Sequence, residues 1–230
     1  MDQSNVESAL ADKIESLNAK INEQLSSGIQ RSIVDCNELT IEVDPLQLHQ
    51  ICTLLRDDAK FDFNMLIDIC GVDYLHYGVD EWETKSATSS GFERGAEPLT
   101  KTKLAIPRFA VVYHLLSLQL NHRIRIRAFL EEKNPKIDSV VDIWPAANWF
   151  EREAYDLFGI SFTKHPDLRR LLTDYGFVGH PFRKDFPLIG RIEARYDAKQ
   201  RQVIYEPVSI EPRVLEPKVI RHDTRYESGE

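Results

Sequence analysis

Residues 148–187 read NWFEREAYDLFGISFTKHPDLRRLLTDYGFVGHPFRKDFP, a stretch in which a short helix pattern leads into a long segment rich in charge, aromatics and glycine. Asn148 and Glu151 have the spacing of a helix N-terminal capping box, and Gly159 has the position of a C-terminal stop. Apolar residues recur between these ends at three- and four-residue spacing, which predicts an amphipathic helix. Its polar face is expected to carry the charged residues Glu151, Arg152 and Asp156.

The segment after this helix is predicted to be irregular, because glycines, prolines and charged residues interrupt every run. A surface loop of this length is usually polar, since it has little to bury. This segment instead carries apolar side chains that need a surface to pack against, namely Phe162, Leu168, Leu171, Leu172, Tyr175, Phe177, Phe182 and Phe186. A loop with its own apolar anchors indicates a docking element.

Ordered motifs along the chain carry a resemblance to a known family. Within the opening stretch they are ERE at 151–153, DLFGI at 156–160, HPDLRR at 165–170, DYGF at 174–177 and GHPFRKDFP at 179–187. Further motifs are FAVVYHLLS at 109–117, RIRI at 123–126, RYD at 195–197 and YEP at 205–207. Together they resemble the C-type, or 30 kDa-type, subunit of proton-pumping NADH:quinone oxidoreductase, respiratory complex I, in its stand-alone bacterial form.

The resemblance implies a non-catalytic structural subunit of the peripheral arm of that enzyme. Electrons then pass from NADH through FMN and Fe–S clusters to quinone in other subunits, and this chain binds none of these cofactors. The implied partners are chiefly the D-type subunit, which helps to form the quinone site, then the B-type and I-type subunits. The implied location is the cytoplasmic face of the bacterial inner membrane, where those partners hold the chain. The C-terminal segment is expected to wrap a neighbouring subunit.

Residues of the family motifs are candidates for the subunit interface or for its support. They are Glu151, Arg152, Glu153, Asp156, His165, Asp167, Arg169, Arg170, Asp174, Tyr175, Gly176, Gly179, His180, Pro181, Arg183, Lys184, Asp185 and Pro187. Residues 164–195 are locally basic inside an acidic chain, which suits either an acidic partner or a solvated charged face. No catalytic, cofactor-binding or metal-binding residue is predicted.

Composition excludes several classes of protein. The net charge of −8 over 230 residues argues against a nucleic-acid binder. No apolar run is long enough to span a bilayer, so we expect no direct membrane insertion. The acidic N-terminus resembles neither a secretory signal nor a transit peptide, which favours a bacterial cytoplasmic chain. Cys36, Cys52 and Cys70 lack the close spacing of Fe–S ligands, and we expect all three to be buried or partly buried free thiols.

The predicted fold class is α/β of the α+β type, a small mixed sheet covered by helices with a long irregular C-terminal arm. The predicted domains are an amphipathic helix at 1–30, an α/β domain at 31–160 with a flexible insertion at 78–105, and an extended docking arm at 161–230. Strands are expected near 39–43, 63–70, 109–117 and 122–129, and helices near 45–57 and 138–158. The first helix is expected to end near residues 26–28, and to pack either on its own domain or on a neighbouring subunit.

Two local patterns carry further expectations. Asp44 and Pro45 match an N-cap followed by proline at the first helical position. Arg123, Arg125 and Arg127 alternate with apolar residues, so one strand face is cationic and contacts either an acidic partner or solvent.

One alternative function comes from a different class of protein. His165 with Asp167, and His180 with Asp185, are residue types that a free-standing metal-dependent hydrolase uses. Each aspartate lies beside arginine or lysine and each histidine precedes proline, which favours structural hydrogen bonding instead. Metal content of the purified chain separates the two functions. A related assembly subunit of a membrane-bound hydrogenase shares nearly every motif and stays open as a third possibility.

Overall fold

The computed structural model describes residues 3–77, 87–88, 91–92 and 106–210, with side chains described from residue 11 onward. The chain forms two compact units. The first contains Met1–Tyr74 and Ile106–Phe186, and the second contains Leu75–Ala105 and Pro187–Glu230. The expectation of a flexible insertion at 78–105 falls almost entirely outside the described residues, as does the end of the C-terminal arm.

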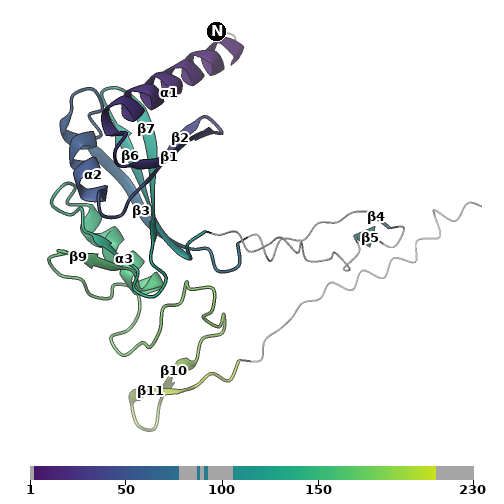
Figure 1. The fold of residues 1–230 in the computed structure, drawn as a ribbon. Coiled ribbons are helices and arrows are strands. Elements are labelled where there is room, and N and C mark those ends of the chain that lie inside the picture. Colours follow the sequence, from purple (N-terminus) through teal and green to yellow (C-terminus); the bar gives the residue numbers. More distant parts are fainter. Residues whose placement is uncertain (1–2, 78–86, 89–90, 93–105, 211–230) are drawn as a thin grey trace, which may run out of the picture. The chain divides into compact units, whose positions relative to one another are not determined.

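The first unit is built on a five-stranded mixed sheet (Figure 1). Its strands are β1 (Ile29–Asp35), β2 (Glu38–Val43), β3 (Met65–Asp73), β6 (Phe109–Ser117) and β7 (His122–Leu130). The spatial order is β1-β2-β7-β6-β3. All neighbours are antiparallel except β2 and β7, which run parallel with Thr40 opposite Arg125. The predicted fold class is therefore confirmed, and β1 is an additional edge strand that was not predicted.

Strand β7 shows how the sequence sets the two faces of the sheet. Ile124, Ile126 and Ala128 alternate along the strand and are all buried, as a strand with one core face requires. On the other face, Arg125 pairs with Glu38 and Arg127 pairs with Glu42, both on the neighbouring β2. These two members of the arginine stripe are therefore held within the sheet, while Arg123 is exposed to solvent.

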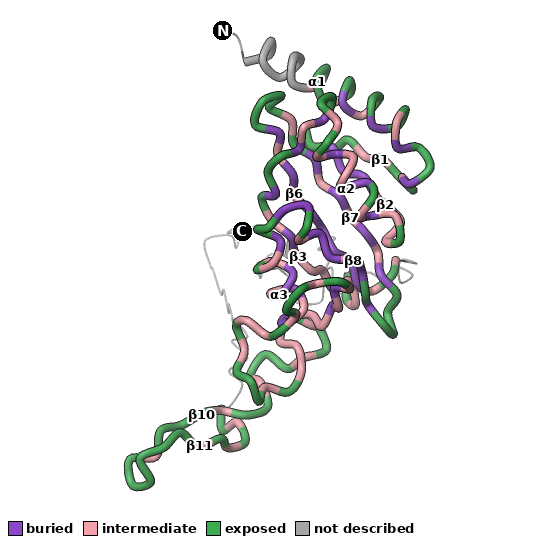
Figure 2. Tube along the Cα trace, turned by 90° about the vertical axis from the view of Figure 1, so that its left-hand side faces the viewer, coloured by how far each residue is buried: buried purple, intermediate pink, exposed green. Residues whose placement is uncertain are grey.

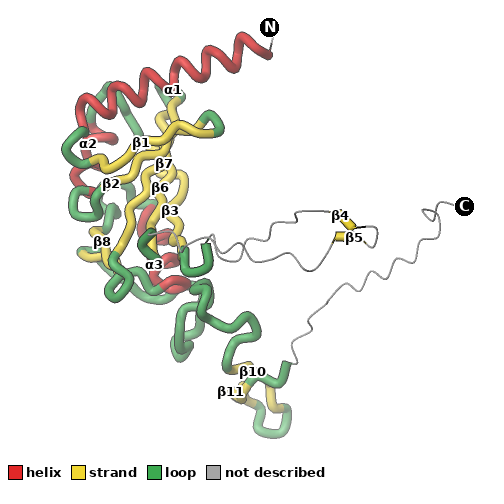
Figure 3. Tube along the Cα trace, turned by 45° about the vertical axis from the view of Figure 1, so that its right-hand side comes forward, coloured by secondary structure: helices red, strands yellow, loops and turns green. Residues whose placement is uncertain are grey.

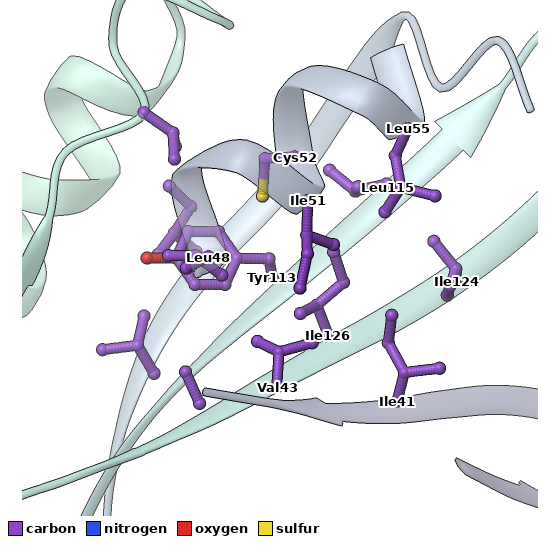
Figure 4. Close-up of a cluster of buried hydrophobic side chains, with 14 of the residues drawn as sticks. Ile41, Val43, Leu48, Ile51, Cys52, Leu55, Tyr113, Leu115, Ile124 and Ile126 are labelled. Atoms are coloured by element: carbon purple, nitrogen blue, oxygen red, sulfur yellow. The ribbon is translucent and has the colours of Figure 1, made fainter. Parts of the chain in front are cut away.

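Three helices complete the first unit: α1 (Gln3–Leu25), α2 (Leu48–Asp57) and α3 (Ala147–Phe158). Helix α1 ends where its periodicity predicts. Its residues Leu17, Ile21 and Leu25 are buried in the core, so its described side chains pack on their own unit. Figure 4 shows side chains of α2, among them Leu48 and Leu55, pointing at the strands. Helix α3 packs against β3.

Both predicted helix starts are wrong. The chain around Asp44 forms a turn, in which Leu46 N–H bonds the Asp44 carboxylate and Gln47 N–H bonds the Asp44 carbonyl, and α2 begins only at Leu48. Helix α3 begins at Ala147, not near 138, because residues 136–146 form a short strand and turns.

The predicted capping box at the start of α3 is also wrong. Asn148 lies inside the helix, and Glu151 Oε1 accepts a hydrogen bond from the backbone N–H of Val140 at 2.8 Å. The carboxylate therefore holds the preceding turn, not the end of its own helix. The predicted stop at Gly159 is confirmed, since its φ of 73° is left-handed and its N–H bonds Tyr155 O.

The core lies between the sheet and the helices, and Figure 2 shows buried residues concentrated there. Gly71 on β3 makes close packing of α3 feasible, because a Cβ at this position would lie 2.7 Å from the ring of Phe158. Cys52 belongs to the core and Cys70 is half-buried, as expected. Cys36 is exposed, against expectation, because it lies in the tight turn between β1 and β2 with a positive φ of 50°.

Short strand pairs make up the remaining regular structure of the described residues. In the first unit, β8 (Lys136–Asp138) pairs in parallel with β9 (Ser161–Thr163). In the second unit, β4 (Ala87–Thr88) pairs with β5 (Gly91–Phe92), and β10 (Ile192–Asp197) forms an antiparallel hairpin with β11 (Gln202–Pro207). This hairpin is not among the elements predicted from the sequence. None of the described helices has the length and apolar character needed to cross a membrane.

Candidate functional site

The candidate site is the segment of residues 164–186, which follows β9 and is drawn as loop in Figure 3. It lacks regular structure, yet a buried carboxylate organises its first half. Asp156 Oδ2 accepts hydrogen bonds from the backbone N–H groups of Leu171, Leu172 and Thr173 at 2.7–2.9 Å. Its Oδ1 accepts from Arg170 Nη1 at 2.9 Å and from the Thr173 hydroxyl. Asp156 therefore does for this loop what a helix or sheet ladder does elsewhere.

Burial of Asp156 by itself would raise the pKa of its carboxyl. The Thr173 hydroxyl and the three backbone N–H groups outweigh burial, and they hold the pKa of Asp156 well below its ordinary value of 3.8. The carboxylate is consequently ionised throughout the physiological range. It is neither a proton donor nor a base near neutral pH, which favours a structural role.

Two more polar side chains of α3 and the loop complete this anchor. Arg152, buried on α3, donates to the carbonyls of Arg169 at 3.3 Å and Arg170 at 3.4 Å. Arg170 in turn donates to the carbonyl of Gly179 at 3.0 Å, which ties the two halves of the segment together. The expectation that Glu151, Arg152 and Asp156 face away from the core is wrong, because all three are buried and bind neighbouring backbone.

The loop returns to the C-terminal end of α3 at residues 180–183. His180 Nδ1 lies 2.8 Å from Asp156 O, Phe182 N–H bonds Leu157 O at 3.0 Å, and Arg183 Nε bonds Phe158 O at 2.6 Å. These groups satisfy carbonyls that the end of a helix leaves without intrahelical partners. The returning loop therefore acts as the C-terminal cap of α3.

Replacing Gly159 with alanine is expected to destabilise the unit by about 2 kcal/mol, because alanine is disfavoured at a left-handed φ. A Cβ at Gly159 would also lie 2.5 Å from Arg183 Nη2 and 2.6 Å from His180 Nε2, so these two side chains of the returning loop must shift. Gly176→Ala is the matched control, since a Cβ there meets no atom within 4 Å. Urea unfolding of both variants measures the difference, and equal midpoints would contradict the capping role of the loop.

A second buried carboxylate anchors the end of the segment. Asp73, at the end of β3, accepts two hydrogen bonds from Arg108 at 3.0 Å and one from the backbone N–H of Lys184 at 3.0 Å. Arg108 also pairs with Asp185 at 2.9 Å, and the guanidinium groups of Arg108 and Arg183 both stack on the ring of Phe109. Asp73 and Arg108 are not among the residues predicted from the sequence, because 35 residues separate them and no local motif joins them.

The histidine and aspartate pairs considered for a hydrolase are not brought together. His165 contacts Asn148 O near the start of α3, whereas His180 contacts Asp156 O, about 12 Å further along the helix at 1.5 Å per residue. Asp167 pairs with Arg169 at the surface, and Asp185 pairs with Arg108. Among the described residues, no three His, Cys, Asp or Glu side chains are grouped so that they could hold a metal ion.

The remaining candidates lie at or near the surface. Glu153, Gly179 and Pro181 are half-buried, and Asp174, Gly176, Lys184 and Pro187 are exposed. The most distinctive feature of this surface is apolar. The same ordered segment exposes the side chains of Leu172, Tyr175, Val178 and Phe182. Tyr175 is 95% exposed. An ordered loop that uses its polar groups internally and presents apolar side chains outward has the character of a protein-binding surface.

The β10–β11 hairpin of the second unit is likewise divided into an apolar face and a charged face. Its register pairs Ala194 with Tyr205 and Tyr196 with Val203, so one face is apolar, and its large side chains are exposed. The other face carries the Arg195–Glu206 ion pair. An isolated two-stranded hairpin is marginally stable in water, which favours packing of the apolar face against another protein.

Comparison with known proteins gives the context for this site. Residues 41–192 match the family described as the 30 kDa subunit of respiratory-chain NADH dehydrogenase. The C subunit of NADH-quinone oxidoreductase from Coxiella burnetii is 57% identical over 91% of this chain and 94% of its own length. The protein of the same name from Legionella pneumophila is 56% identical over 95% of this chain and 97% of its own length.

A solved structure shows the same fold at lower identity. It belongs to the membrane-bound sulfane sulfur reductase, an archaeal respiratory membrane complex, with a TM-score of 0.54 and 20% identity over 76% of this chain and 86% of that chain. The segment anchored by Asp156 and Asp73 lies wholly within the residues that match the family. From the family match and the two close relatives, we conclude that this chain belongs to the family of 30 kDa subunits of respiratory-chain NADH dehydrogenase.

Proposed function

We propose that the chain is a non-catalytic structural subunit of the peripheral arm of proton-translocating NADH:quinone oxidoreductase, and that residues 164–186 dock it beside the D-type subunit. Membership of the family makes the chain a subunit of this enzyme complex. The observation that carries the finer proposal is that the loop presents apolar side chains outward, while its charged residues Arg170, Arg183 and Asp185 bind their own chain.

A structural role agrees with the state of the polar groups. Asp156 and Asp73 are committed to backbone N–H groups and arginines, and His180 contacts a helix carbonyl. Cys52 lies in the core, where burial raises the pKa of its thiol and disfavours the thiolate that a metal cluster needs. FMN and the Fe–S clusters of the complex are accordingly assigned to partner subunits, as is quinone binding.

The second unit supplies the other docking element of the proposal. The exposed apolar face of the β10–β11 hairpin suits a neighbouring subunit, with the B-type and I-type subunits as candidates beside the D-type one. Such contacts would hold the chain at the cytoplasmic face of the inner membrane through its partners. They would also stabilise the peripheral arm where it meets the membrane part.

The proposal is tested by co-purification of the D-type subunit with the tagged full-length chain expressed in its own cell. The variant Tyr175→Ser with Val178→Ser removes exposed apolar side chains while leaving the hydrogen bonds of Asp156 intact. We expect the affinity for the D-type subunit to fall by about 30-fold or more, as at an interface hot spot. The measurement is the fraction of that partner retained through washing.

The matched control removes exposed apolar side chains elsewhere, at Leu46 (92% exposed) and Leu118 (64% exposed). The control Leu46→Ser with Leu118→Ser is expected to retain the D-type subunit, and circular dichroism checks that both variants fold. Removal of residues 187–230 tests the second unit separately. If the Tyr175 and Val178 variant binds the D-type subunit as tightly as the control does, residues 164–186 are not the docking site.

A further inference from the structure

The five-stranded sheet has one face turned toward α2 and α3 and one face turned away from them. Figure 4 shows the side that faces α2, where the labelled strand residues include Tyr113, Leu115, Ile124 and Ile126. Helix α3 packs on the same side, because Gly71, which lies against it, is paired with Val111 on β6. Successive side chains of a strand alternate between faces, so His114, Arg123 and Arg125 belong to the opposite face.

A small pocket opens on this opposite face, near the turn that joins β6 to β7. Its volume is about 150 Å³, and its lining includes Glu38, Ile67, His114, Arg123 and Arg125. Strand pairing brings these residues together, because His114 lies directly opposite Arg125 and β7 runs beside β2, which carries Glu38. The pocket has room for several water molecules, and therefore for one carboxylate group with its methylene.

The charges that line this pocket do not balance. Arg125 is engaged, since it pairs with Glu38 and its Nη1 donates to Thr40 Oγ1 at 3.3 Å. Arg123 is exposed, and within the described part of the chain no hydrogen bond or ion pair engages its guanidinium group. With two arginines and one glutamate in the lining, one positive charge has no counterpart.

We propose that this pocket binds a single carboxylate of a neighbouring protein subunit, presented by an aspartate or glutamate side chain, with Arg123 as its ion-pair partner. A planar guanidinium group can hold a carboxylate through two parallel N–H bonds. One carboxylate balances the charge of the lining. A phosphate group, at a charge of about −1.5 to −2, would bring excess negative charge beside Glu38.

The surroundings of the pocket favour a protein over a free small anion. Ile67 in its lining is 40% exposed, and Met65 on the same strand is 44% exposed. Apolar side chains beside an arginine are typical of a protein interface, where they pack on the stem of the partner's side chain. The family makes this chain a subunit of a larger enzyme complex, so neighbouring subunits are present.

This contact is separate from docking through residues 164–186. That segment is anchored on α3, and α3 packs on the other face of the sheet. The chain would therefore contact neighbouring subunits through both faces of its first unit. The proposal also gives a role to the one member of the arginine stripe that is not paired within the sheet.

The test uses the assembled complex, purified from the protein's own cell with Arg123→Lys in this chain. Lysine keeps the positive charge, and a carbodiimide can couple its amine to a carboxylate in direct contact, which the arginine side chain does not allow. We expect mass spectrometry to find residue 123 coupled to an aspartate or glutamate of another subunit. Arg31→Lys is the matched control, because Arg31 is exposed on β1 outside the pocket, and we expect no such link from it.

A second variant, Arg123→Gln, removes the charge. The apparent Kd of the chain for the rest of the complex is expected to rise about tenfold at low salt. The difference from the native chain should shrink at about 1 M salt, where the Debye length is about 3 Å. The measurement is the fraction of the chain retained through washes of increasing ionic strength, with Arg31→Gln as the control and circular dichroism as the check of folding.

Three results would overturn the proposal. One is coupling of residue 123 to Glu38 of its own chain, because the pocket would then satisfy its own charge. Another is no coupling at residue 123 in a sample where Lys164 is coupled to Asp138, whose Oδ2 lies 2.7 Å from Lys164 Nζ and which therefore reports that the reaction worked. The third is equal retention of Arg123→Gln and Arg31→Gln. None of these results affects docking by residues 164–186, which is read from Tyr175 and Val178.

Discussion

Replacing Asp156 with alanine is expected to lower the free energy of unfolding by about 3–5 kcal/mol, the cost of removing one partner from a buried charge pair. The substitution leaves Arg170 and the N–H groups of Leu171, Leu172 and Thr173 without their shared acceptor. A domain of this size is stable by about 5–15 kcal/mol, so the loss is a large share of the total. Urea unfolding followed by circular dichroism measures it.

Local order provides a second measurement for Asp156→Ala. Trypsin cleaves after arginine, and Arg169 and Arg170 lie in the segment that the carboxylate organises. We expect the variant to be cut there faster than the native chain under conditions where the sheet stays folded. Asp167→Ala is the control, because Asp167 forms only an exposed pair with Arg169 and its loss should cost less than about 1 kcal/mol. Equal effects of the two substitutions would contradict the organising role of Asp156.

The second large effect concerns the pH dependence of stability. The pKa of the Glu151 carboxyl is raised from an ordinary value of 4.5 to about 7, chiefly because the group is buried. Hydrogen bonds from Ser139 and from the backbone of Val140 act to lower this pKa, and the nearby charge of Asp142 acts to raise it. Cys52 and Tyr113 are the titratable groups that face it from α2 and β6. The folded state therefore binds the Glu151 proton more tightly than the unfolded chain does.

This raised pKa gives the pH effect a definite sign. The contribution of Glu151 to stability is fully present below pH 4.5 and is lost as the pH rises through about 7. Each pH unit between 4.5 and about 7 changes the free energy of unfolding by about 1.4 kcal/mol, so the whole window changes it by about 3 kcal/mol. Asp156 acts oppositely, since its lowered pKa gives stability that is lost on acidification below 3.8. The two groups are thus separable by pH.

The measurement is the free energy of unfolding of native chain and Glu151→Gln between pH 4.5 and 7.5. Glutamine keeps an oxygen for the Val140 N–H but carries no titrating proton. We expect the difference in stability between the two proteins to change by about 3 kcal/mol across the window. The exposed substitution Glu131→Gln is the matched control. A constant difference for Glu151→Gln across the window would show that its carboxyl titrates as in water.

The sheet and helices were largely predictable because their signals are local. The alternation of Ile124 and Ile126 with arginines predicted β7, and the four-residue spacing of Leu17, Ile21 and Leu25 predicted α1. Strand β1 was missed because it is an edge strand with little buried surface and therefore lacks alternation. The start of α2 was misplaced because Asp44 matches a cap pattern that the neighbouring turn overrides. The start of α3 was placed too early because residues 136–146 form a short strand and turns.

The candidate site was located from its motifs, but the roles of its charged residues were not readable. Arg170, a candidate for the interface or for its support, binds Asp156, and Asp185 binds Arg108. Asp73 contacts Lys184 across 111 positions of sequence. Such pairings depend on where the chain returns in three dimensions, which no local spacing specifies. Whether individual residues also contact a partner protein stays a prediction.

The order of strands in the sheet also determines when the protein can fold during its synthesis. Strand β7 lies at the centre of the five strands and is the last of them to leave the ribosome. Its parallel partner β2 precedes it by about 85 residues. At a synthesis rate of about 5–20 residues per second, β7 is made about 4–17 s after β2. Until then Leu39, Ile41 and Val43 have no central strand beside them. The nascent chain therefore exposes an apolar hairpin for seconds, and chaperones are expected to bind it in that interval.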